Sequence, residues 1–164
     1  MQRKRVATPP ELWSSTWARD VSSCDRRTGR RKGNCNMAFQ LMIVDDSAAM
    51  RAFIVRVIWL SGLEVGQCVQ ASNGREALEL MRENWIDIVL TDINMPVMNG
   101  EELVRCMEQD EMLRNIPVLV ISTDGSAHRV QQMMALGAKG FVKKPFSPEL
   151  LRSNMEELLG VGHD

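Results

Sequence analysis

Beyond residue 38, short apolar runs alternate with longer amphipathic segments five times along the chain. Runs of four to seven mostly apolar residues are typical of strands buried on both faces of a parallel sheet. The segments between them have the apolar spacing of helices that cover such a sheet. The expected strands are Phe39–Val44, Glu64–Gln70, Ile86–Thr91, Ile116–Ser122 and Lys139–Val142.

Capping residues mark the start of each expected helix. Ser47 can cap the first helix, which we expect to end at Ser61-Gly62. Strands that alternate with helices of this length need right-handed crossovers and a parallel sheet. The sequence therefore predicts an α/β fold with a doubly wound, five-stranded parallel sheet. The later helices are expected to open at Asn73-Gly74, Asn99-Gly100, Gly125-Ser126 and Ser147-Pro148, the last with Pro at the first helical position.

Formal charge divides the chain into two parts. Residues 1–36 hold nine Lys and Arg against three Asp and Glu, whereas residues 37–164 hold eleven against eighteen. Because residues 1–36 also lack periodicity, we predict a disordered basic N-terminal extension followed by one domain over 37–164. Met37 directly precedes the first strand, so an alternative hypothesis is that the native protein starts there. The acidic domain argues against nucleic acid as a direct partner.

Composition also indicates a compartment. The four cysteines form no CxxC pair, the basic start is not followed by a sustained apolar stretch, and no apolar run approaches the length of a membrane span. We therefore expect a cytoplasmic protein with no membrane partner.

Groups capable of chemistry follow four of the expected strands. Asp45 and Asp46 follow the first, Asp92 the third, Ser122 ends the fourth, and Lys144 follows the fifth. The carboxyl ends of parallel strands share one edge of a sheet, so these side chains should converge. Three neighbouring carboxylates repel one another unless a cation intervenes, and Mg²⁺ prefers such oxygen ligands. A solvated turn or a surface lysine would explain each group alone, but the combination is more specific and predicts a metal-assisted phosphorylation site.

The motifs at these strand ends resemble those of the receiver domain of two-component response regulators. The resemblance covers about residues 39–160 and implies a flavodoxin-like, CheY-like sheet with strand order 2-1-3-4-5. It is carried by Val44-Asp45-Asp46-Ser47, Thr91-Asp92-Ile93-Asn94-Met95-Pro96 with Asn99-Gly100, Val120-Ile121-Ser122-Thr123 and Val142-Lys143-Lys144-Pro145-Phe146.

The resemblance implies roles for the acidic residues. Asp92 would be the phosphoacceptor, attacking the phosphorus of a phosphohistidine on a partner. Asp46, Asp92 and the backbone carbonyl of Asn94 would bind Mg²⁺, with Asp45 acting through a bound water molecule.

The resemblance also implies a switch. Ser122 and Lys144 would contact the phosphoryl oxygens once Asp92 is modified, and Phe141 would turn inward as the loop after Ser122 moves. The Lys144-Pro145 bond is expected to be cis.

Three positions are expected to modulate the site. Thr123 stands where the family commonly has a small residue, which would restrict access to the phosphoacceptor. Asn94 and Asp124 match positions that influence the lifetime of the aspartyl phosphate, and this polar pair implies a short lifetime.

The function expected from the resemblance is a stand-alone, monomeric, chemotaxis-type receiver that is not an enzyme acting on other molecules. A sensor histidine kinase or a histidine phosphotransfer protein would supply the phosphoryl group. A downstream protein would bind the face formed by the fourth helix, fifth strand and fifth helix. An alternative role is a phosphorelay intermediate that passes the group onward. A phosphatase of the haloacid dehalogenase type would need an acid where Asn94 stands, and a flavodoxin would need a phosphate-binding loop after the first strand.

The first helix carries two apolar surfaces in the sequence. The pair Val55 and Trp59 falls on the opposite side from the sheet and is a candidate docking patch for a phosphoryl donor. Scattered surface apolarity is the alternative explanation. The stripe expected to face the sheet is Met50, Phe53, Ile54 and Val57.

Overall fold

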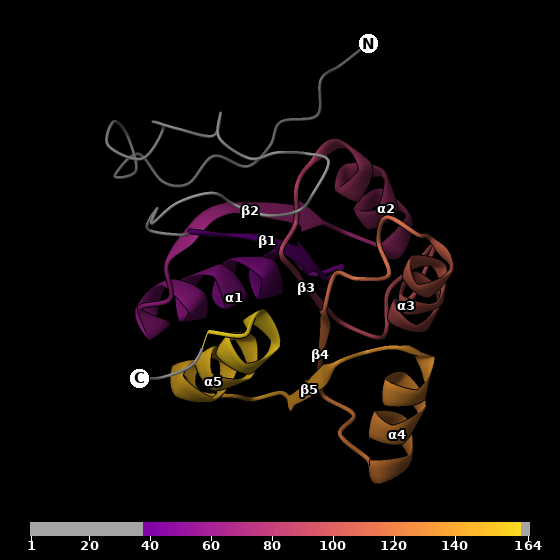
Figure 1. The fold of residues 1–164 in the computed structure, drawn as a ribbon. Helices are drawn as coiled ribbons and strands as arrows, with labels where there is room; N and C mark the ends of the chain where they lie inside the picture. Colours follow the sequence, from indigo (N-terminus) through magenta and orange to yellow (C-terminus); the bar gives the residue numbers. More distant parts are fainter. Residues whose placement is uncertain (1–37, 162–164) are drawn as a thin grey trace.

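One sheet of five parallel strands organises the part of the chain that the computed structural model describes, residues 38–161. The strand order is β2-β1-β3-β4-β5, which confirms the predicted fold class and order (Figure 1). The predicted extension over residues 1–36 lies outside the described residues. The strands are β1 (Phe39–Val44), β2 (Val65–Ala71), β3 (Ile88–Thr91), β4 (Val118–Ser122) and β5 (Gly140–Lys143).

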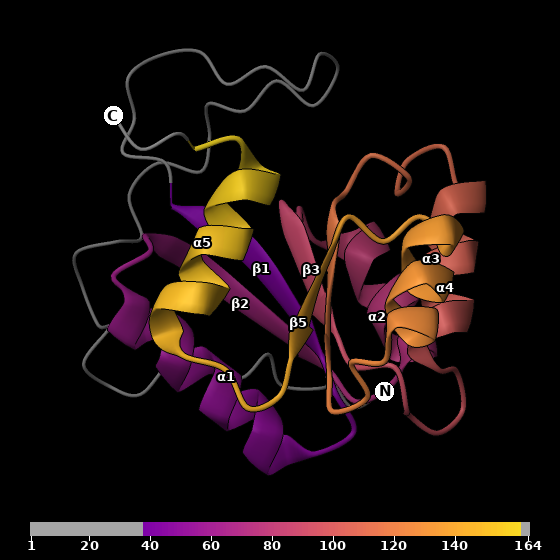
Figure 2. The same ribbon diagram turned by 90° about the horizontal axis from the view of Figure 1, so that it is seen from below.

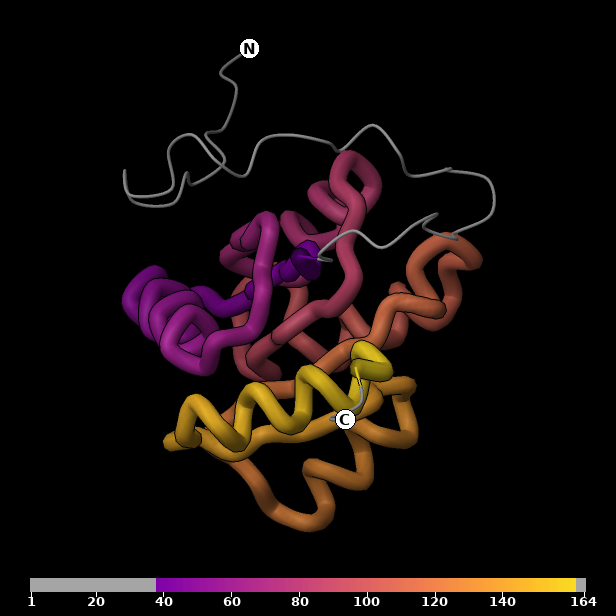
Figure 3. The backbone as a smooth tube through the Cα atoms, turned by 60° about the vertical axis from the view of Figure 1, so that its left-hand side comes forward, coloured from indigo at the N-terminus to yellow at the C-terminus, as the bar shows by residue number. Residues whose placement is uncertain are grey.

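Helices cover both faces of the sheet. Helices α1 and α5 lie on one face and α2, α3 and α4 on the other, as Figure 2 shows with the sheet between them. Figure 3 shows α5, in yellow, running alongside β5, with which it is in contact. The helices are α1 (Ala48–Ser61), α2 (Gly74–Glu83), α3 (Gly100–Gln109), α4 (Ala127–Leu136) and α5 (Pro148–Leu159). None of these helices has the length and apolar character needed to cross a bilayer, and this holds for all the described residues.

A hydrophobic core lies on each face of the sheet, because successive side chains of the central strands alternate between the two faces. In β1, Leu41 and Ile43 pack toward α1 and α5, whereas Met42 and Val44 pack toward the other three helices. All four side chains are fully buried. Successive residues of a strand point to opposite faces, so a continuous apolar run fills both cores at once.

Each helix begins at the cap residue that the sequence predicts. The side chain of the cap accepts a hydrogen bond from a backbone N–H in the first turn, which would otherwise lack a partner. At the other end of α1, Gly62 adopts a left-handed conformation with φ 74°. The caps are Ser47, Asn73, Asn99, Ser126 and Ser147.

Four strands begin later than predicted: β2 and β5 begin one residue later, and β3 and β4 begin two residues later. β3 starts at Ile88 because Asp87 Oδ2 accepts the Gln40 N–H at 2.8 Å, so a side chain takes the place of a ladder partner. β4 starts at Val118, directly after Pro117, which has no N–H to donate. Ile86 is buried in the core although it lies outside β3, so its apolar character indicated burial correctly but did not indicate a strand residue.

One residue of the predicted stripe on α1 is placed wrongly. Phe53 is 46% exposed and does not face the sheet. Its ring packs on Phe146, with the ring centroids 5.9 Å apart, because this side of α1 faces the beginning of α5. Ile54 and Val57 are buried as predicted, and Ile58 is buried with them.

The start of α3 packs against the residues that follow β3. Gly100 donates its N–H to the carbonyl of Ile93 at 2.8 Å. A Cβ atom on Gly100 would overlap the main-chain carbonyl oxygen of Asp92 and lie 2.9 Å from the Cα of Ile93. Backbone atoms cannot move aside as a flexible side chain can, so this position needs glycine.

Replacing Gly100 with Ala should therefore destabilise the fold by about 3 kcal/mol, the upper range for forced overpacking. Gly160 is the matched control, because its φ is 68° but a Cβ atom there would meet nothing within 4 Å. Gly160→Ala should cost only about 1 kcal/mol of left-handed strain. The free energy of unfolding in urea checks both values, and equal losses would contradict the close packing at Gly100.

Candidate functional site

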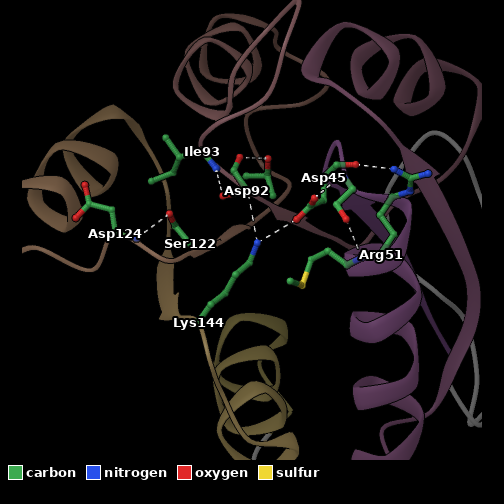
Figure 4. Close-up of polar contacts among 10 residues, drawn as sticks. Asp45, Arg51, Asp92, Ile93, Ser122, Asp124 and Lys144 are labelled. Carbon is green, nitrogen blue, oxygen red and sulfur yellow. Dashed lines mark hydrogen bonds and ion pairs between the residues drawn. The ribbon is translucent and has the colours of Figure 1, made fainter.

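The carboxyl ends of β1, β3, β4 and β5 bring the predicted site residues together (Figure 4). Asp92 donates its main-chain N–H to the carbonyl of Val44 at 2.9 Å, so the end of β3 is fixed against the end of β1. Lys144 donates its main-chain N–H to the carbonyl of Ser122 at 2.8 Å, which joins the ends of β5 and β4. Groups separated by up to 99 residues therefore meet at one edge of the sheet.

Lys144 lies between two of the carboxylates. Its Nζ donates to Asp45 Oδ2 at 3.0 Å and to Asp92 Oδ2 at 3.3 Å. The Lys144 side chain is only 10% exposed, so water screens these ion pairs weakly. The sequence predicted the approach of Lys144 to Asp92, and it missed the shorter contact with Asp45.

Asp45 is the most deeply buried of the acidic residues, at 2% exposure. Its Oδ1 accepts the Ser47 N–H at 2.8 Å, which closes the turn between β1 and α1, and its Oδ2 accepts from Lys144. Both carboxylate oxygens thus have partners. The alternative of a fully solvated turn is wrong for Asp45, whereas Asp46 is exposed.

Asp45, Asp46 and Asp92 form an acidic cluster. One carboxylate oxygen from each lies within 4.8 Å of the others. Opposite ligands of an octahedral Mg²⁺ ion lie about 4.2 Å apart, so small side-chain movements would bring all three oxygens onto one ion. Three carboxylates against the single ammonium group of Lys144 also leave a formal negative charge. The donor set therefore fits a hard divalent cation.

Asp92 is held at the opening of the cluster. Its Oδ1 accepts the N–H of Ile93 at 2.7 Å, and its side chain is 16% exposed, against 3% for Asp45. Of these two carboxylates, Asp92 is the one that an incoming molecule could reach.

Ser122 and Asp124 form a hydrogen-bonded turn beside the cluster. Ser122 is fully buried, and its Oγ accepts the N–H of Asp124 at 3.3 Å. Hydrogen bonds from Ser126 lower the pKa of the Asp124 carboxyl, and the positive charges of Arg129 and Lys143 lower it further. Asp124 is therefore a stable anion near the site.

The remaining predicted residues lie on the loops after β3 and β4 and on β5. Asn94 and Thr123 are exposed on the loops that follow β3 and β4. Phe141 is half-buried in β5 and packs against the core on the side of α2, α3 and α4. The Lys144-Pro145 peptide bond is cis, as predicted.

Arg51 is a neighbour of the site that the sequence analysis missed. Its Nη1 donates to the main-chain carbonyl of Asp45 at 2.6 Å, and its Nε donates to Gln70 Oε1 at 3.1 Å. An arginine in the first turn of the helix that follows an acidic pair was the available signal, because that turn must pass close to the end of β1.

The predicted pair on α1 is only partly exposed. Trp59 is 65% exposed, but Val55 is half-buried and packs against the core beneath α1 and α5. Trp59 stands eleven residues beyond Ala48, so it lies about 16 Å along the helix from the end that carries the site.

Comparisons with known proteins agree with this geometry. The family model described as response regulator receiver domain matches residues 41–156. The chemotaxis protein CheY1 of Helicobacter pylori is 34% identical over 123 residues, which cover 74% of this chain and 98% of that protein. The chemotaxis response regulator CheY4 of Vibrio cholerae has a solved structure with 30% identity and a TM-score of 0.67, covering 74% of this chain and 99% of that one.

A more distant structure shares the fold. The receiver domain of the sensor histidine kinase PA1611 from Pseudomonas aeruginosa has a TM-score of 0.67 at 18% identity, covering 76% of this chain and 99% of that one. That structure holds a magnesium ion coordinated in its active site cleft.

The acidic cluster leads to a prediction for Asp46. Asp46→Asn removes one of three repelling charges, so without divalent cations it should stabilise the fold by about 0.5 kcal/mol. The same change should reduce the stabilisation that Mg²⁺ gives the wild type by binding the folded state. Urea unfolding in EDTA and in Mg²⁺ measures both effects.

The control is Glu79→Gln, which removes a charge from an exposed position on α2 outside the cluster. Glu79→Gln should change neither the free energy of unfolding in EDTA nor the additional stability that Mg²⁺ provides. An Asp46→Asn variant that Mg²⁺ stabilises as strongly as the wild type would show that Asp46 does not bind the ion.

Proposed function

The chain belongs to the response regulator receiver domain family, and we propose that it is a phosphorylation switch in which Asp92 accepts the phosphoryl group. The observation that carries this proposal is the position of the Asp92 carboxylate, partly exposed beside Asp45 and Asp46 and 3.3 Å from Lys144. A carboxylate nucleophile with a cation and a metal-binding cluster beside it has what phosphoryl transfer requires.

The proposed reaction transfers a phosphoryl group from a phosphohistidine. A carboxylate oxygen of Asp92 attacks the phosphorus, an O–P bond forms, and the P–N bond breaks with its electron pair returning to the imidazole nitrogen. The product is an acyl phosphate on Asp92. Water would later hydrolyse the acyl phosphate, which restores the Asp92 carboxylate and releases inorganic phosphate. The chain would thus modify only itself, as a signalling protein and not as an enzyme that turns over other molecules.

Mg²⁺ is the proposed cofactor. Asp46, Asp92 and the backbone carbonyl of Asn94 would hold the ion, with Asp45 acting through a bound water molecule. When bound, Mg²⁺ offsets the negative charge of the transferring group. The fit of the three carboxylates supports this assignment, as does the magnesium ion in the Pseudomonas aeruginosa fold neighbour.

The proposed switch uses groups already beside Asp92. Phosphorylation adds three acceptor oxygens and roughly −1.5 to −2 charges. Lys144 is close enough to pair with one oxygen, and the Ser122 hydroxyl would bond another after leaving its turn with Asp124. Because Ser122 ends β4 and Phe141 lies on β5, which pairs with it, movement of this loop would reach the neighbouring surface.

The proposed partners follow from this arrangement. A sensor histidine kinase or a histidine phosphotransfer protein would donate the phosphoryl group, and a downstream protein would bind the surface of α4, β5 and α5. This chain covers 98% of the length of the Helicobacter pylori chemotaxis protein, which supports a chemotaxis-type role. The proposal further takes the chain to be a monomer in the cytoplasm. A relay role is the second candidate, and onward transfer of labelled phosphoryl groups from Asp92 to a histidine phosphotransfer protein would favour it.

The donor patch on α1 needs revision. Trp59 lies far from the site along the helix, whereas Phe53 and Phe146 pair beside the loop that follows Lys144. Phe53 is 46% exposed and lies in the second turn of α1. We therefore place the proposed donor contact at Phe53 rather than at Val55 and Trp59.

Acetyl phosphate with Mg²⁺ tests the proposed function. The wild-type chain should gain the mass of one phosphoryl group, and EDTA should prevent this. Asp92→Asn, which keeps the shape of the side chain but removes the nucleophile, should gain nothing. Intact-mass spectrometry provides the measurement, and modification of Asp92→Asn to the wild-type extent would refute Asp92 as the acceptor.

Asp124 provides a test of the proposed lifetime. Its carboxylate is an anion two residues beyond Ser122, and the proposal is that it orients the hydrolytic water molecule. Asp124→Leu should therefore lengthen the half-life of the aspartyl phosphate about tenfold, equivalent to about 1.4 kcal/mol in the barrier. Loss of the phosphoryl mass after removal of acetyl phosphate measures the rate, and an unchanged half-life would exclude this role.

A further inference from the structure

Arg51 connects three elements beside the acidic cluster. It belongs to the first turn of α1, and its two hydrogen bonds reach Asp45 at the end of β1 and Gln70 near the end of β2. The planar guanidinium group directs its donors along fixed lines, so two such bonds determine the position of what they hold. The turn that carries Asp45 and Asp46 is therefore fixed from outside the cluster.

Asp45 consequently lies between two cations. Figure 4 shows its carboxylate directed toward Lys144 and its main-chain carbonyl directed toward Arg51. The two contacts differ in kind. The ammonium group of Lys144 binds the Asp45 side chain and is shared with Asp92. The guanidinium group of Arg51 binds the Asp45 backbone.

This difference matters when Asp92 is modified. In the proposed function, Lys144 pairs with a phosphoryl oxygen, which draws its charge away from Asp45. The partners of Arg51 are the Asp45 carbonyl and the Gln70 amide oxygen, and neither is a group that phosphorylation of Asp92 modifies. Arg51 is thus placed to hold the acidic turn in both states.

We propose that Arg51 is a positioning residue that fixes the acidic turn for binding of Mg²⁺, through its directed hydrogen bonds and not through its charge. The inference rests on the proposed function and adds a residue to it. Removing a group that hydrogen-bonds to and orients a metal ligand typically weakens metal affinity by about 10–100-fold.

The direction in which Mg²⁺ affinity changes when Arg51 is replaced distinguishes a positioning role from an electrostatic one. A positive charge near a cation site opposes binding of the cation. If only the charge of Arg51 acted, its removal would strengthen Mg²⁺ binding. If its hydrogen bonds position the acidic turn, its removal weakens binding despite the more favourable charge.

The experiment is a titration of the full, unphosphorylated chain with MgCl₂, followed by the shifts of backbone amide resonances. Arg51→Gln and Arg51→Lys should each bind Mg²⁺ about tenfold more weakly than the wild type. Lys keeps the charge but cannot make both directed hydrogen bonds of the guanidinium group. A loss of Mg²⁺ affinity in Arg51→Lys therefore reports the positioning effect alone. Gln70→Ala, which removes only the second hydrogen bond, should weaken binding less than Arg51→Gln does.

Arg56→Gln is the matched control, since Arg56 is exposed on the same helix and the substitution removes the same charge. It should bind Mg²⁺ as the wild type does or slightly more tightly. The resonance spectrum of each variant without Mg²⁺ shows whether it is folded, and Arg51→Lys keeps the test decisive if Arg51→Gln does not fold.

Either of two results would overturn the inference: Arg51→Gln binding Mg²⁺ as tightly as Arg56→Gln does, or Arg51→Lys binding it as the wild type does. Failure of the proposed function has a different signature. In that case the wild-type chain itself neither binds Mg²⁺ nor takes a phosphoryl group from acetyl phosphate.

Discussion

The ammonium group of Lys144 is shared by two carboxylates in a cluster of three. It lies 3.0 Å from Asp45 and 3.3 Å from Asp92, and its own charge cannot balance those of both residues and of Asp46. A site with this imbalance attracts a divalent cation, and its lysine is ready to change partners when an anion is added. In the proposed function, metal binding and switching are thus two consequences of one electrostatic arrangement.

The rest of the fold keeps these charges close together. Repelling carboxylates would separate unless the backbone beneath them were fixed, and the fully buried ends of β1 and β3 supply that rigidity. Gly100 lets α3 start directly against Asp92. Packing energy from the two cores therefore offsets the electrostatic cost of the site, as is common where function opposes stability.

Much of this could be predicted from sequence because parallel strands place their carboxyl ends at one edge. That rule was sufficient to bring Asp92 and Lys144 together. It does not determine side-chain partners within the edge, so the shorter bond from Lys144 to Asp45 and the contact made by Arg51 were missed. Helical periodicity also misplaced Phe53, because a wheel shows which side a residue faces but not whether a neighbouring helix lies there.

In the proposed switch, Lys144 exchanges Asp45 for the phosphoryl group on Asp92. A crystal structure of the wild-type chain with Mg²⁺ and beryllofluoride, a mimic of the phosphoryl group, tests it most directly. We expect Lys144 Nζ to lie within hydrogen-bond distance of a fluorine atom of the beryllofluoride on Asp92 and to have left Asp45. A structure in which beryllofluoride occupies Asp92 while Lys144 stays on Asp45, with no contact to fluorine, would contradict it.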